Sequence, residues 1–232
     1  MGYWITLGFL IVFYIIGVFS VDRIKIKEKY VNLIFSLTIF LSYLYCVIHI
    51  YNSVGANDWN FLNTLPVANV SPFMYVLTFA SLFFPKVIRK YVYSLISLLS
   101  LAMFFAGLLS CVGYILRDYA FHFTIALDAF VHVLLSLYGV YLVKSKQVDV
   151  SERNSMIISG SIIVGVAILM LILNLIFRTS FFGLSLYGDH NIYNFVLIDN
   201  GVASALVYFM GLSGLLFVGY YFQRLLVRKH GR

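Results

Sequence analysis

Charged side chains are scarce in this sequence. Asp, Glu, Lys and Arg make up 11% of the 232 residues, and only 9 residues are acidic. Ordinary soluble domains carry about 25% charged and about 45–50% apolar residues, whereas 62% of the residues here are apolar. The composition therefore excludes an ordinary soluble domain and predicts a membrane protein.

Cysteine is scarce as well, with Cys46 and Cys111 as the two examples. Without a Cys-x-x-Cys pair, neither a zinc site nor a thioredoxin-like redox pair is predicted, and we expect no metal or other cofactor. Two buried free thiols are the expected state, and a disulfide between them stays open. Phosphate-loop, nucleophile-elbow, zinc-protease and dinucleotide-binding motifs are missing too.

Long apolar runs are abundant. A helix needs about 20 mostly apolar residues to cross about 30 Å of hydrocarbon. The runs predict an all-α polytopic membrane protein in which residues 1–232 form one domain of seven transmembrane helices. The predicted spans are about 3–21, 31–50, 67–84, 92–115, 125–143, 156–177 and 203–222.

Basic residues alternate between the gaps that separate these spans. All of the 16 Lys and Arg residues except Arg117 and Arg178 lie in the first, third and fifth gaps and in the C-terminal tail. The positive-inside rule then places the N-terminus outside and the C-terminus in the cytoplasm. The net charge of +7 becomes a property of the cytoplasmic face, where it attracts anionic lipids. We expect a cell-membrane location and membrane lipids, not nucleic acid, as partners.

Asp128 is the one acidic residue within a predicted span. Thr124, Asp128 and His132 follow at four-residue steps and share one helical stripe. Because a charged Asp on the lipid face costs about 2.5–3.5 kcal/mol, the stripe is expected to face the bundle interior or a water-filled cavity. An Asp one turn from a His orients the imidazole as a general base requires. His132 and Asp128 are therefore the candidate catalytic residues, with a structural ion pair as the alternative.

Other polar side chains gather toward the outer ends of the spans, and we find nothing comparable at the inner ends. This distribution predicts a polar pocket that opens outward. Interhelical hydrogen bonding without any ligand is the competing interpretation. Gly211 and Gly214 are expected at close helix contacts. The candidate pocket residues are His49, Asn52, Asn69, Ser71, His122, Thr124, Asn174, Arg178 and Tyr208.

Three short segments resemble the YwaF-like family of seven-helix integral membrane proteins. They are Leu65–Ser71 (LPVANVS), the run around His132, and the stretch from Asn174 into the last span. The resemblance covers about residues 30–222. The family is similar to multi-pass enzymes that transfer or hydrolyse the fatty-acyl groups of lipids. The resemblance therefore implies a seven-helix fold with His132 in the active site.

The sequence departs from the family pattern at the nucleophile. With Asn69 aligned, Ala68 stands where acyltransferase-like members carry a cysteine, and Pro66 stands where they carry a histidine. A nucleophilic mechanism needs a thiol or hydroxyl within reach of the base, and Ala68 has neither. Thr64 and Ser71 lie about one turn away without occupying the family position.

Three functions remain open at this point. The first is a lipid acyltransferase or acyl-ester hydrolase with His132 as base. The second, slightly favoured by the missing nucleophile, is a non-catalytic membrane subunit that binds a lipid or acyl group or serves a protein partner in a complex. The third is a small-solute or proton-coupled transporter, or the substrate-binding component of an importer, with Asp128 as protonation site. The lack of an internal repeat speaks against the third.

Overall fold

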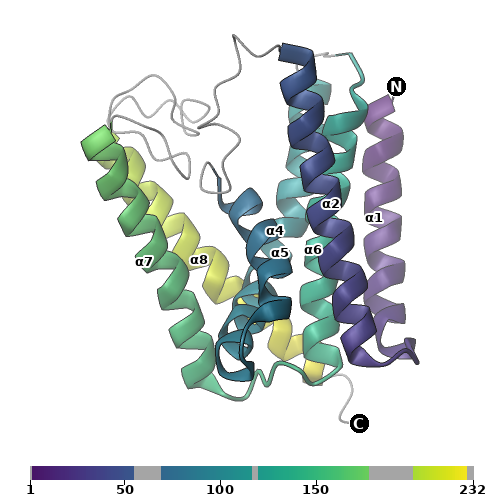
Figure 1. Cartoon of the computed structure of the whole chain (residues 1–232), viewed down its shortest axis with the longest axis vertical. Helices are drawn as coiled ribbons and strands as arrows, with labels where there is room; N and C mark the ends of the chain where they lie inside the picture. Colours follow the sequence, from purple (N-terminus) through teal and green to yellow (C-terminus); the bar gives the residue numbers. More distant parts are fainter. Residues whose placement is uncertain (1, 55–68, 117–119, 178–200, 229–232) are drawn as a thin grey trace.

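The computed structural model describes residues 2–54, 69–116, 120–177 and 201–228, and these ranges are helical apart from short connections. Short 3₁₀ turns follow two of the helices, at Val21–Arg23 and Ser81–Phe83. The α-helices of the described ranges are α1 Gly2–Ser20, α2 Glu28–Val54, α4 Val70–Ala80, α5 Lys86–Leu116, α6 Phe123–Lys144, α7 Arg153–Phe177 and α8 Gly201–Arg228 (Figure 1).

Six of the described helices are long and apolar enough to cross a membrane, namely α1, α2, α5, α6, α7 and α8. The all-helical class is thereby confirmed for the described residues, and the long apolar helices are compatible with the membrane protein that the composition predicts. The kind of membrane and the orientation within it stay predictions.

Helix α4 is shorter than the span predicted at 67–84. It has 11 residues and a 3₁₀ turn of 3 residues, which together reach only about 20 Å at about 1.5 Å per residue. Asn69 has the extended backbone of an N-cap (φ −142°, ψ 162°), and Pro72 lies in the first turn, where its missing N–H costs nothing. In Figure 1, α4 begins part-way along the bundle.

The two ends of the bundle differ in their connections. The connections that carry most basic residues, from α1 to α2, from α4 to α5 and from α6 to α7, come together at the lower end in Figure 1. The N-terminus lies at the upper end and the C-terminus at the lower end. The count of seven membrane crossings stays a prediction, since α4 is shorter than the six helices that are long enough to span.

The core is centred on the pairing of α5 with α6, where small residues bring the backbones together. A Cβ atom added at Gly139 would lie 2.7 Å from the Ser100 Cβ, and one added at Gly219 of α8 would collide with the Leu98 carbonyl oxygen of α5. Around Gly211 and Gly214 there is open space. The expectation of close contact there is wrong as far as the described residues go, because none of them packs against that face of α8.

The lower half of the bundle contains buried polar networks that the sequence analysis missed. Asn32 Nδ2 donates to Tyr93 Oη at 3.1 Å and to Gln147 Oε1 at 2.7 Å. Gln223 Nε2 donates to the Ser97 carbonyl at 2.9 Å. The expectation that polar groups gather only at the outer ends is therefore wrong. Gln147 fell in a predicted gap and Gln223 just beyond the last predicted span, so neither was counted.

Both cysteines are buried and free, Cys46 on α2 and Cys111 on α5. The expectation of two separate thiols is confirmed.

Candidate functional site

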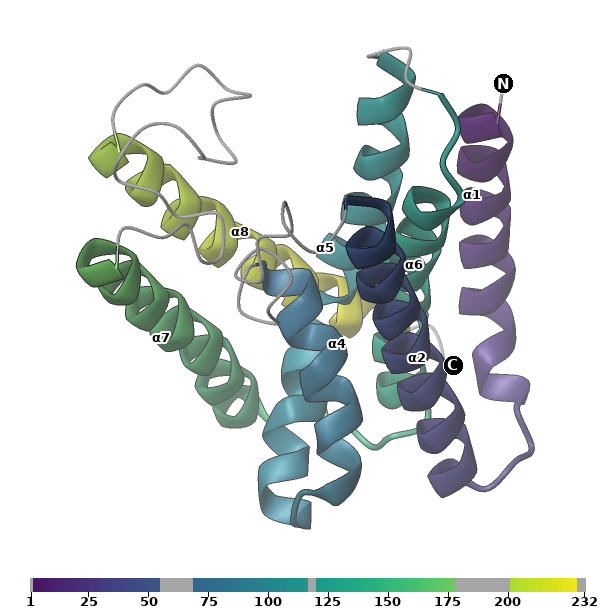
Figure 2. The same ribbon diagram turned by 45° about the horizontal axis from the view of Figure 1, so that its top comes forward.

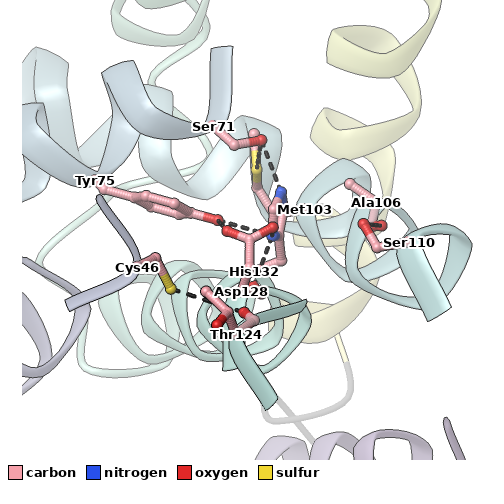
Figure 3. Close-up of polar contacts among 9 residues, drawn as sticks. All are labelled: Cys46, Ser71, Tyr75, Met103, Ala106, Ser110, Thr124, Asp128 and His132. Atoms are coloured by element: carbon pink, nitrogen blue, oxygen red, sulfur yellow. Dashed lines mark hydrogen bonds and ion pairs between the residues drawn. The ribbon is translucent and has the colours of Figure 1, made fainter. Parts of the chain in front are cut away.

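Helices α4 and α6 meet through a serine and a histidine (Figure 3). Ser71 is the second residue of α4 and is half-buried, and His132 lies near the middle of α6 with 6% of its surface exposed. The Ser71 Oγ is 2.8 Å from the His132 Nε2, although the residues are 61 positions apart in the sequence. A hydroxyl and an imidazole nitrogen are thus within hydrogen-bond reach.

The hydrogen-bond partners of the other ring nitrogen, Nδ1, indicate which tautomer of His132 is present. Nδ1 lies 2.8 Å from the backbone carbonyl oxygen of Asp128 and 2.7 Å from the Tyr75 hydroxyl. A carbonyl oxygen can only accept, so Nδ1 carries the hydrogen and donates it. Nε2 is left with a lone pair, and the Ser71 hydroxyl donates to it. In this tautomer the imidazole is set to take the serine proton.

Asp128 contacts His132 through its backbone carbonyl and, at a longer distance, through its carboxylate. Its carboxylate Oδ2 is 3.5 Å from Nδ1, further away than its own backbone carbonyl. Its Oδ1 accepts from the Tyr75 hydroxyl at 3.4 Å. The Asp128 side chain is 44% exposed and that of His132 only 8%. Asp128 therefore holds the imidazole through its backbone and through Tyr75, and its carboxylate faces outward.

Tyr75 and Met103 belong to the site, and neither was predicted from the sequence. Tyr75 is 1% exposed, and its ring meets the His132 ring edge-on, with centroids 5.5 Å apart. The Met103 Sδ of α5 lies 3.8 Å from the Ser71 Oγ, but a thioether is a weak acceptor and the imidazole nitrogen is the stronger one. Tyr75 was detectable, because it follows Ser71 by four residues and shares its helical face. Met103 has no such signal.

A second polar contact lies about two helical turns from His132, closer to the upper end, and joins α2 to α6. The His49 Nδ1 is 3.1 Å from the Thr124 Oγ1. The Cys46 Sγ donates to the Thr124 carbonyl at 3.7 Å (Figure 3). The predicted Thr124–Asp128–His132 stripe thus makes its contacts with α2 and α4, while the Asp128 side chain stays 44% exposed.

The remaining candidates lie apart from this cluster. Asn69 is exposed at the N-cap of α4, and its side chain makes no capping hydrogen bond. His122 is exposed at the N-cap of α6, where its backbone N–H donates to the Tyr3 hydroxyl at 2.9 Å.

Two further candidates are buried on α7 and α8, namely Asn174 and Tyr208. Figures 1 and 2 show these helices diverging from α1, α2 and α6 toward the upper end. The side chain of Asn52 and the whole of Arg178 lie outside the described residues. A pocket that unites all of these residues stays a prediction.

Among residues 2–54, 69–116, 120–177 and 201–228, no three His, Cys, Asp or Glu side chains cluster closely enough to hold a metal ion.

Fold and site together define a helical membrane protein with a hydrogen-bonded Ser–His pair between two of its helices. Comparison with known families, with curated proteins and with solved structures gives no match. The YwaF-like resemblance therefore stays a prediction, and the function has to be inferred from the geometry of the site.

Proposed function

We propose that this protein is an integral-membrane serine enzyme that hydrolyses or transfers the acyl group of a lipid ester, with Ser71 as nucleophile and His132 as base. The observation that carries the proposal is the 2.8 Å contact between Ser71 Oγ and His132 Nε2. A serine hydroxyl is a weak nucleophile until a neighbouring base takes its proton. His132 is held in the tautomer that accepts it.

The reaction follows from these roles. The Ser71 Oγ attacks the ester carbonyl carbon as its proton passes to His132 Nε2. His132 then gives that proton to the leaving alkoxide, and the acyl group stays on Ser71. Water or the hydroxyl of a second lipid attacks the acyl-serine and passes its proton to Nε2, which returns it to the Ser71 Oγ. Water makes the protein a hydrolase, and a lipid hydroxyl makes it an acyltransferase.

The start of α4 supplies the charge stabilisation that acyl transfer needs. The first N–H groups of a helix have no acceptor within the helix and form its positive end. Pro72 has no N–H, so those of Val70 and Ser71 are the donors beside the nucleophile. Backbone donors of this kind stabilise the negative oxygen of a tetrahedral intermediate.

The depth of the site favours a lipid over a water-soluble ester. His132 lies nine residues beyond Phe123, the first residue of α6, which corresponds to about 14 Å along the helix axis. The helices around it are apolar enough to cross a membrane, so the substrate has to bring an apolar chain to this depth. The resemblance to a family related to lipid acyl enzymes points to the same substrate class.

The proposed nucleophile is Ser71, whereas the family pattern has a cysteine at the position of Ala68. Ala68 lies outside the described residues, and Ser71 follows it by three positions in the sequence. The competing interpretation is a non-catalytic lipid-binding subunit, in which the Ser71–His132 hydrogen bond only fastens α4 to α6. The two interpretations differ in the reactivity of Ser71.

That reactivity can be measured with a long-chain alkyl fluorophosphonate, which bonds its phosphorus to an activated serine oxygen and releases fluoride. We expect labelling of the purified protein at Ser71, located by peptide mass spectrometry. Ser71→Ala and His132→Gln should each lower the labelling rate by at least about a hundredfold, since general base catalysis is worth about 10²–10⁴.

Ser110 provides the matched control. It lies on α5, and its Oγ donates to the Ala106 carbonyl of its own helix at 3.0 Å (Figure 3). Ser110→Ala should be labelled at the same rate as the wild type. The melting temperature of every variant should lie within a few degrees of the wild-type value. A folded wild type that stays unlabelled, or that is labelled equally after His132→Gln, would refute the enzyme and favour the subunit.

A further inference from the structure

A cavity of about 530 Å³ lies at the lower end of the bundle, away from Ser71 and His132. It is formed where α7 begins and α8 ends, in the region where Figure 1 shows these helices closest to α5. Leu98 of α5, which is 3% exposed, contributes to its wall. Its volume falls in the range of small-molecule sites, about 300–1,000 Å³.

The charged residues that line this cavity are both cations, Arg153 of α7 and Arg224 of α8. Glu152, the neighbour of Arg153, is already paired with Lys90, with 2.6 Å between Oε2 and Nζ. Within the part of the chain that the structure describes, neither arginine forms an ion pair. Both arginines are exposed, and within the described residues no carboxylate offsets their charges, so the cavity can accept an anion.

Local structure adds to this preference for an anion. Arg153 is the first residue of α7, so its side chain lies beside the positive end of the helix dipole. The Arg224 Cζ stands 5.7 Å from the centroid of the Tyr220 ring. A planar guanidinium matches the oxygens of a phosphate in a paired geometry.

The rest of the cavity is apolar and open sideways. Met156 is buried, whereas Phe217 is 62% and Ile157 53% exposed. These exposed side chains lie on helices that are long and apolar enough to cross a membrane, so we expect them to meet lipid chains. A free phosphate has nothing to contact on such a wall, but an acyl chain does.

We propose that this cavity is a binding site for an anionic phospholipid, with its phosphate between Arg153 and Arg224 and one acyl chain along α7 and α8. The site is independent of the proposed acyl chemistry, since it lies in the opposite half of the bundle. Basic pockets between helices are a known mode of head-group recognition.

The test is native mass spectrometry of the purified protein after incubation with an equimolar mixture of phosphatidylglycerol and phosphatidylcholine. Both lipids carry a phosphate, but the choline cation of phosphatidylcholine offsets its negative charge and is repelled by the two arginines. We therefore expect the wild type to retain phosphatidylglycerol about tenfold more than phosphatidylcholine, which corresponds to about 1.4 kcal/mol. The double variant Arg153→Gln/Arg224→Gln should lose this preference.

Lys27→Gln/Lys86→Gln is the matched control. It removes two exposed charges at the same end of the bundle, outside the cavity, and should keep the preference. If this control loses the preference as fully as the arginine variant, general surface charge explains the binding and the site is refuted. Equal retention of both lipids by the wild type also refutes it.

Gly160→Val tests the apolar wall of the cavity. It also provides a test that does not depend on correct folding of the arginine variant. Gly160 lines the cavity, and a Cβ atom there would lie 3.6 Å from the Leu216 Cδ1, an ordinary contact. Valine therefore fills space while both arginines remain, and we expect retention of phosphatidylglycerol to fall at least fivefold. Unchanged retention, or displacement of the lipid by millimolar inorganic phosphate, overturns the proposal of a lipid site.

Discussion

At the scale of single residues, the position of the His132 ring depends on Tyr75. The Tyr75 hydroxyl is the shared neighbour of the His132 Nδ1, at 2.7 Å, and of the Asp128 carboxylate, at 3.4 Å. The carboxylate alone is 3.5 Å from Nδ1, too far for a short charge-assisted hydrogen bond. Tyr75 therefore connects an acid and a base that would otherwise touch only loosely.

We predict that Tyr75→Phe slows the labelling of Ser71 by the fluorophosphonate about tenfold. The variant removes a hydrogen bond worth about 0.5–1.5 kcal/mol, and about 1.4 kcal/mol corresponds to a factor of ten in rate. Tyr45→Phe is the control, because the Tyr45 ring is exposed and packs against His49 on the rim of α2. Equal rates in the two variants, measured with unchanged melting temperatures, would show that Tyr75 is only a packing residue.

At the scale of elements, the close approach of α5 to α6 fixes the site. A Cβ atom at Gly107 of α5 would lie 2.7 Å from the Ala129 carbonyl oxygen and 3.1 Å from the His132 Cβ. Gly107 is thus the residue that lets α5 lie against the segment of α6 that carries the base. A larger residue has to push the two helices apart at His132.

Gly107→Ala is therefore expected to destabilise the protein by about 1–3 kcal/mol, the usual cost of overpacking, and to slow the labelling of Ser71. Gly113→Ala is the control on the same helix, since a Cβ there meets nothing within 4 Å and alanine favours the helix. Thermal unfolding in detergent measures both variants. A melting temperature of Gly107→Ala equal to that of Gly113→Ala would contradict the packing described above.

The helices that the sequence predicted well are those with long apolar runs. The span predicted at 125–143 is found as Phe123–Lys144, and that at 156–177 as Arg153–Phe177. The shorter α4 was not foreseen, because the helix begins at the N-cap Asn69 and passes into a 3₁₀ turn at Ser81, and hydropathy registers neither boundary. Apolar content thus predicts membrane helices better than it predicts their first turns.

The candidate site was predictable only where its members share a helix. The four-residue step from Asp128 to His132 is visible in the sequence, and so is the partly polar face of α2. The contacts of Ser71 and Met103 with this pair depend on how α4 and α5 pack against α6, and no local pattern encodes that packing. The same reason explains why Gly219, and not Gly214, meets α5.

At the scale of the whole molecule, the two termini lie at opposite ends of the bundle (Figure 1), and the basic connections mark the end that carries the C-terminus. The positive-inside rule assigns that end to the cytoplasm. With this predicted orientation, Ser71 and His132 are nearer the outer membrane surface than the basic end is. The Arg153–Arg224 cavity is then at the level of the inner leaflet.

We predict that a fluorescent protein fused to the C-terminus fluoresces in the cytoplasm and that a tag at the N-terminus is cleaved by protease added to intact cells. The control is the same tag at the C-terminus, which should be protected until the membrane is opened. Cleavage of the C-terminal tag in intact cells would reverse the orientation and place the cavity at the outer surface.

Because α4 starts inside the bundle, its first turn holds the Ser71 hydroxyl at one fixed height between the two membrane surfaces. Lipids also keep their groups at fixed heights, with head groups outermost and the ends of the chains at the midplane. An enzyme built in this way would choose among ester bonds by where each one stands along the membrane normal. The thickness of the surrounding bilayer would then govern its selectivity as strongly as the shape of any binding site.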